Sequence, residues 1–149
     1  MADHMWARIR IGGALPRSHF EAFRQAAGLD HGDIKQHIVD GVFELEHSEC
    51  AFGRFEELEK LCREIDLPFI RQSDGKYEHS PEIVFRTAGD CGEPDTVILD
   101  HADTMMVPMS VLQSVRNAWE QKSWEDIRDI VNEHLVELPT LPPFSVQST

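Results

Sequence analysis

The sequence is poor in positive charge and in cysteine, and it has no long apolar run. Its 14 Lys and Arg stand against 27 Asp and Glu, which gives a formal net charge of -13. This balance excludes a chain that binds nucleic acid directly, because phosphate binding requires a basic face. Three cysteines without paired spacing argue against a disulfide framework. No apolar run approaches the ~20 residues that a membrane-spanning helix needs.

What is present is sufficient for one folded domain. The 149 residues match the usual size of a single domain, and 41% of them are hydrophobic, enough to build a core. The first eight residues lack the apolar stretch of a secretory signal. We therefore expect a cytoplasmic protein.

Hydrophobic periodicity predicts alternating strands and helices over the first hundred residues. We expect strands over 6–13, 42–47, 67–72, 82–86 and 96–99. We expect helices from Leu15 and Pro16 to Gly28 and from Gly53 to Asp66, whereas residues 34–39 fit either a short helix or a strand. The order βαβαβββ predicts an α+β fold, in which a small sheet carries its helices on one face.

The C-terminal third predicts an αα-hairpin and a tail. Apolar side chains recur at helical spacing over about 108–121 and again over 123–138, with a very short connection between the two helices. Ser123-Trp-Glu-Asp resembles the start of a capping box, and Pro139 is expected to end the second helix. We divide the single domain 1–149 into a sheet part (1–100), a helical hairpin (105–138) and an uncharged, proline-rich tail (139–149) that we expect to pack against something. The expected apolar stripes are Val111, Leu112, Val115, Ala118 and Trp119 on the first helix and Trp124, Ile127, Val131, Leu135 and Leu138 on the second.

The charge is unevenly distributed. Residues 29–66 contain eleven acidic and four basic side chains, and residues 87–149 contain eleven and three. The helix over 53–66 is expected to compensate its own charge through Glu56 with Lys60 and Glu59 with Arg63, both at i,i+4 spacing. The N-terminal 28 residues are slightly basic. Their four arginines form either a counter-face for acidic neighbours or a homodimer contact: Arg8, Arg10, Arg17 and Arg24.

Four carboxylates recur at strict four-residue spacing on the final helix and predict a gently winding acidic row. Four residues rise ~6 Å along a helix, a spacing comparable to that of phosphates along one nucleic-acid strand, and only Arg128 offers local compensation. Such a row fits a groove of Lys and Arg built for DNA or RNA. A solvated face that keeps the protein soluble is the alternative interpretation. The row consists of Glu125, Asp129, Glu133 and Glu137, and Glu120 and Asp126 lie beside it as further candidate partner-binding residues.

Cys91 lies in a glycine-flanked loop and precedes Asp100-His101-Ala-Asp103. A cysteine nucleophile, a histidine base and an orienting acid are the parts of a thiol hydrolase, and the same run could hold a metal. The alternative function is therefore a small thiol-dependent or metal-assisted hydrolase that uses Cys91, His101 and Asp103.

His47, Cys50 and Cys62 are a weaker candidate for a metal site. Structural zinc requires four convergent nitrogen or sulfur ligands, and only three are visible here. Cys62 also falls on the apolar stripe of a helix, so we interpret it as a core thiol. We expect neither a metal nor a cofactor.

Two stretches carry a resemblance to known proteins. The opening Arg-Ile-Arg-Ile-Gly-Gly-Ala-Leu-Pro, and the segment from Gly53 through Leu67-Pro-Phe-Ile-Arg-Gln-Ser-Asp-Gly-Lys-Tyr, resemble small acidic accessory proteins of proteobacterial phages, plasmids and integrative elements, over about residues 5–115. The resemblance implies no catalytic residues. It implies the setting of anti-restriction and anti-CRISPR inhibitors, many of which occupy the nucleic-acid surface of a defence complex in the host bacterial cell. The expected function is accordingly non-enzymatic: an acidic inhibitor of a basic nucleic-acid-binding protein or ribonucleoprotein complex.

Overall fold

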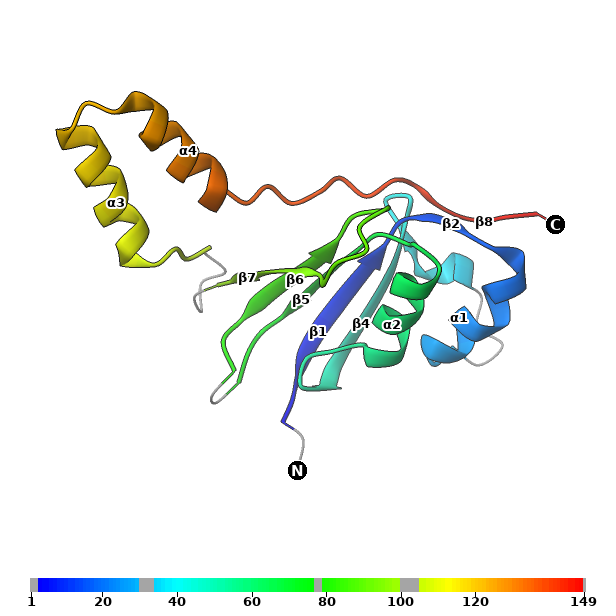
Figure 1. Cartoon of the computed structure of the whole chain (residues 1–149). Coiled ribbons are helices and arrows are strands. Elements are labelled where there is room, and N and C mark those ends of the chain that lie inside the picture. Colours follow the sequence, from blue (N-terminus) through cyan, green and yellow to red (C-terminus); the bar gives the residue numbers. More distant parts are fainter. Residues whose placement is uncertain (1–2, 30–33, 77–78, 100–104, 149) are drawn as a thin grey trace.

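The computed structural model describes residues 3–29, 34–76, 79–99 and 105–148, and it confirms the α+β class. Figure 1 shows a twisted sheet with helices on one face and a helical hairpin set off from that sheet. The C-terminal tail runs from the hairpin back across the sheet part. Within the described residues, no helix has both the length and the apolar character needed to cross a membrane.

Six strands form an antiparallel sheet in the order β3-β4-β1-β5-β6-β7. In the central strand β1, Ala7, Ile9 and Ile11 are fully buried and alternate with half-buried arginines, as the period of two predicts. Arg8 Nη1 lies 3.6 Å from Glu44 Oε1 on the neighbouring strand. This contact agrees with the interpretation that the N-terminal arginines face acidic neighbours of the same chain. The strands are β1 (His4–Ile11), β3 (Ile38–Val39), β4 (Val42–Ala51), β5 (Phe69–Ser73), β6 (Glu82–Arg86) and β7 (Asp95–Ile98).

Helices α1 (Phe20–Ala26) and α2 (Glu56–Glu64) lie on one face of this sheet (Figure 1). Phe23 from α1 and Leu58 and Cys62 from α2 are fully buried in the main core. Helix α2 begins three residues later than expected. Gly53 has a φ of 64°, and a Cβ on it would lie 2.7 Å from the Cβ of Ser73, so a tight turn precedes the helix.

The tail adds a strand that the periodicity did not predict. β8 (Phe144–Val146) pairs in parallel with β2 (Gly13–Leu15), a segment that we expected to lead directly into a helix. The Phe144 ring lies 5.5 Å from the ring of Phe23 and 5.7 Å from that of Phe43, measured between centroids. The expectation that the tail packs against something is thus confirmed, and the structure shows that it packs on the sheet part of its own chain.

The sequence allowed either a short helix or a strand over residues 34–39, and the structure contains one after the other. A short 3-10 helix, η2 (Ile34–His37), is followed by strand β3, which pairs with the start of β4. A second 3-10 helix, η1 (Arg17–His19), occupies the first turn of the predicted N-terminal helix.

Candidate functional site

The helical hairpin consists of α3 (Met109–Glu120) and α4 (Trp124–His134). Lys122 has a φ of 56°, and the Ser123 N–H donates to the Ala118 carbonyl at 2.9 Å, so the chain reverses within a few residues. Ser123 is the residue that precedes α4, as predicted, but its side chain makes no capping hydrogen bond, so the capping-box prediction is wrong in that respect.

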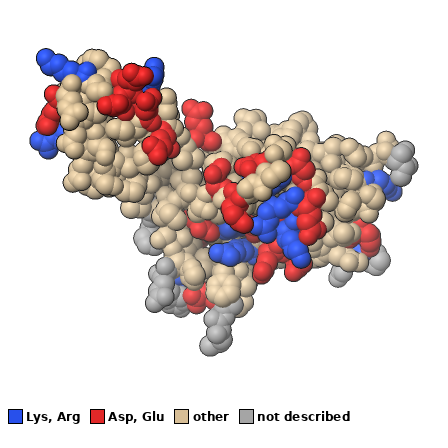
Figure 2. Space-filling view, viewed as in Figure 1, with Lys and Arg blue, Asp and Glu red and all other residues tan. Residues whose placement is uncertain are grey.

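One side of the hairpin is acidic, and it carries three of the six predicted partner-binding residues. Asp126, Asp129 and Glu133 project from α4 into a shallow groove of about 350 Å³ between the two helices. The facing wall is polar and uncharged. It contains Ser114 and Asn117 from α3 and Gln121 just after it, and no Lys or Arg lines the groove. Figure 2 shows acidic side chains gathered on the hairpin, apart from the charged cluster over the sheet part. We call this surface the acidic side.

The charge of the acidic side is only weakly compensated. Arg128 lies 3.9 Å from Glu125 and 3.7 Å from Asp129, as the sequence predicted for the one basic residue of α4. Glu120 on α3 lies 3.4 Å from Arg116. These side chains are mostly exposed, and exposed pairs contribute ~0–1 kcal/mol. Among the described residues, Asp126 and Glu133 form no ion pair, so this side keeps a net negative charge.

Glu137 does not belong to the row, and this part of the prediction is wrong. Helix α4 ends at His134, because Leu135 is already extended with a ψ of 111°. The chain must leave the helix here to return to the sheet, and Pro139 disfavours helical backbone just before it. Glu137 instead lines a small hollow beside β6 and β7, together with Thr96. The helical row is therefore Glu125, Asp129 and Glu133.

A second charged cluster lies on the helix-covered face of the sheet, and the sequence analysis missed its role. Arg71 is 3% exposed, and its Nε donates to Glu59 Oε1 at 2.9 Å. Its Nη1 donates to the Gly53 carbonyl at 2.8 Å and to Glu82 Oε1 at 3.2 Å. The predicted pair of Glu59 with Arg63 does not form, since Arg63 lies 3.8 Å from Glu93 instead. The burial of Arg71 could have been predicted from the sequence, because the period of two in a strand places Arg71 on the same face as the buried Phe69.

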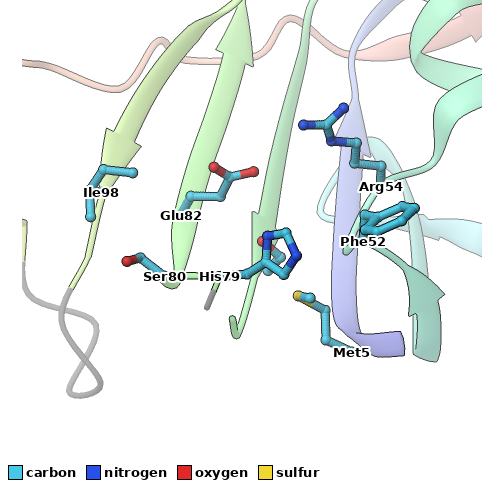
Figure 3. Close-up of a pocket in the computed structure, with 8 residues that line it drawn as sticks. Met5, Phe52, Arg54, His79, Ser80, Glu82 and Ile98 are labelled. Carbon is cyan, nitrogen blue, oxygen red and sulfur yellow. The ribbon is translucent and has the colours of Figure 1, made fainter. Parts of the chain in front are cut away.

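Beside this cluster is an open cavity of about 420 Å³. Figure 3 shows Phe52 and Arg54 from the segment after β4 on one wall, with Glu82 and Ile98 on the other. The His79 ring lies between them and contacts Phe52 edge-on at 5.9 Å between centroids. Opposite charges line the cavity together, so it has no net preference for an anion or a cation.

The cysteines fall into two classes. Cys50 and Cys62 are buried and Cys91 is exposed, and none forms a disulfide. Burial raises the pKa of both buried thiols. Zinc binds the thiolate, so their environment favours the core-thiol interpretation. Across the described ranges, no group of three His, Cys, Asp or Glu residues is arranged to hold a metal.

Arg86 on β6 holds the loop that contains Cys91 against the sheet part through hydrogen bonds. This buried guanidinium donates to Asp66 Oδ1 at 2.7 Å and to the Asp90 carbonyl at 2.9 Å. Hydrogen bonds from Arg86 and from the Gly89 N–H lower the pKa of the Asp66 carboxyl. The described residues around Cys91 include no histidine, and His101 and Asp103 lie outside the described residues. The hydrolase hypothesis therefore gains no support from the described residues.

The thiols should differ sharply in reactivity. We expect Ellman's reagent to modify one thiol per native chain quickly and all three only in denaturant, because Cys50 and Cys62 are buried. Cys91→Ser should remove the fast phase and leave the circular dichroism spectrum unchanged. Rapid modification of two or more thiols in the native protein would contradict the described burial.

No family model matches the chain, and neither the curated proteins nor the solved structures that were compared with it contain a match. Function must therefore be argued from the α+β fold and from the hairpin that it displays.

Proposed function

We propose that the protein is a non-enzymatic binding protein whose helical hairpin docks, through its acidic side, onto a basic surface of a partner. The partner class that fits is a nucleic-acid-binding protein or ribonucleoprotein, in which the carboxylates would occupy Lys and Arg that otherwise bind phosphates. Inhibition of a host defence complex, as the resemblance implies, would be the consequence of that occupancy.

The observation that supports the proposal is the acidic groove between α3 and α4. Its three carboxylates come from one helix, and no basic side chain lines it. Like charges at this spacing destabilise a helix by ~0.2–0.5 kcal/mol per pair, and the single Arg128 compensates them only in part. A partner that supplies Lys and Arg would remove that repulsion, so the same feature favours binding.

The position of the hairpin also supports the proposal. It is attached to the sheet part at both ends, and it is set off from that part in Figure 1. Phe144 anchors the returning chain in the main core. An arm that presents exposed side chains suits insertion into a groove of a larger assembly.

Charge reversal tests the proposal. Asp129→Lys with Glu133→Lys should weaken capture of basic partners from a nuclease-treated bacterial lysate at least about tenfold, mainly through slower association. The matched control is Glu56→Lys with Glu57→Lys on α2, which changes the net charge equally at another exposed site. It should bind nearly as well as the unchanged protein.

Salt and nucleic acid provide two further readouts of the same capture. Binding at about 0.1 M salt should be lost at about 0.5 M, where screening is stronger. Added nucleic acid should compete with the protein for its partner. If both double variants retain partners equally, or if competing nucleic acid has no effect, the acidic side is not the binding surface.

A further inference from the structure

The hairpin has a second side, opposite the acidic one, that is apolar and open to solvent. Its members are exposed by 42% to 63%, unusual for side chains of this size. We call this surface the apolar side, and it consists of Leu112, Trp119, Trp124 and Val131.

Helical geometry places these side chains on one surface. Leu112 and Trp119 are seven residues apart on α3, and Trp124 and Val131 are seven apart on α4, so each pair lies on one side of its helix. The short connection makes α3 and α4 antiparallel and brings the two pairs together. The Trp119 and Trp124 rings meet edge-to-face, with centroids 5.0 Å apart.

The exposure of the apolar side departs from the sequence-based expectation. The predicted stripes would all be covered in a closed bundle, but two helices can bury only the seam between them. Val111, Val115, Ala118 and Ile127 are half-buried or buried, as is the neighbouring Ile130, whereas the remaining stripe residues stay 37% to 63% exposed.

We infer that the apolar side is the contact between two copies of this chain, which pair their hairpins into a four-helix bundle. Helices that carry apolar residues on two sides are typical of such bundles. One set of residues packs in the seam between α3 and α4, and the hairpin of the second copy would cover the apolar side. A two-fold axis brings the same surface of each copy together. Trp119 and Trp124 are still 61% and 63% exposed, so each can bury roughly 90–150 Å² more on pairing. Together with Leu112 and Val131 they would supply up to about half of the ~800 Å² per partner of a standard interface, and the side chains around them would supply the rest.

The charge distribution is compatible with this pairing despite the net charge of -13. The acidic side faces away from the apolar side, so the two acidic grooves would lie on opposite outer surfaces of the bundle. The nearest arginines, Arg116 and Arg128, already lie beside carboxylates of their own chain. Pairing therefore neither apposes the acidic rows nor buries an uncompensated charge.

Sedimentation equilibrium of the whole chain tests the inference. The protein should have twice the 17.0 kDa of one chain at micromolar concentration, at both low and high salt, because apolar contact is insensitive to screening. Leu112→Asp with Val131→Asp should raise the dimer Kd by more than about tenfold, since charges would enter the contact. Asp129→Asn with Glu133→Gln on the acidic side is the matched control and should remain dimeric.

Tryptophan fluorescence supplies a readout that does not depend on the substituted residues. In a Trp6→Phe background, the emission of Trp119 and Trp124 should shift to longer wavelength on dilution through the Kd. A monomer at every concentration would overturn the inference, as would a dimer that the two aspartates leave unchanged. If the apolar side instead binds an unrelated protein, the isolated chain will be monomeric, so that outcome also counts against a second copy.

Discussion

Arg71→Met is expected to lower the free energy of unfolding by about 3–5 kcal/mol, because it removes one partner of a buried ion pair. Glu59 is 8% exposed, and its carboxylate accepts hydrogen bonds from Arg71 and from the Phe55 N–H at 2.8 Å. Without the guanidinium, this carboxylate would remain buried with one neutral donor. The Gly53 carbonyl would lose its partner as well, and the turn before α2 would loosen.

Denaturant unfolding at neutral pH measures the effect, and two variants make it specific. Arg63→Met removes an exposed arginine 3.8 Å from Glu93 and should cost less than about 1 kcal/mol. Adding Glu59→Gln to Arg71→Met should recover part of the loss, because the uncompensated charge is then gone. Equal stability of Arg71→Met and Arg63→Met would show that the buried network does not stabilise the fold.

Gly12→Ala is expected to expel the C-terminal strand from the sheet part. A Cβ at this position would lie 2.3 Å from the Pro142 carbonyl oxygen, a backbone atom that cannot rotate away. Strand β8 would lose its pairing with β2, and Phe144 would leave the rings of Phe23 and Phe43. We expect a loss of about 2–4 kcal/mol, the range for removing a large side chain from a core.

Displacement of the tail has a local signature besides the change in global stability. Amides of β2 and β8 should exchange with solvent much faster in Gly12→Ala, and a protease should cleave within 139–148 sooner. Gly92→Ala is the control, because the nearest atom to its added Cβ is a carboxylate oxygen of Asp90 at 3.3 Å. Unchanged exchange at β8 in Gly12→Ala would mean that the tail accommodates the methyl group.

The main elements of the fold could be predicted from periodicity. The strand over 82–86 has the bounds observed for β6, and the two predicted helices are present as α1 and α2, with Phe23 and Leu58 buried. The pairing of β2 with β8 could not be predicted in this way. Each strand is only three residues long, and its pairing depends on a contact between the two ends of the chain.

The candidate site was predictable to the extent that helix geometry determines it. Glu125, Asp129 and Glu133 share one helix, so their four-residue spacing was sufficient to place them in a row. Glu137 was placed wrongly because the path of the tail, rather than local propensity, ends α4. The burial of Arg71 was not predicted, because it depends on pairing with Glu59 and Glu82, which lie on other elements.

The sequence by itself determined the acidic charge and the alternation of strands and helices. It also determined that the C-terminal helices carry apolar side chains on one side and carboxylates on another. These features depend on neighbours within a few residues. Only the tertiary structure decided which carboxylates remain together, that Arg71 is enclosed between Glu59 and Glu82, and that the tail returns to β2. These outcomes depend on contacts between residues far apart in the chain. The net charge of -13 is thus a property of the sequence, whereas the acidic side of the hairpin is a property of the fold.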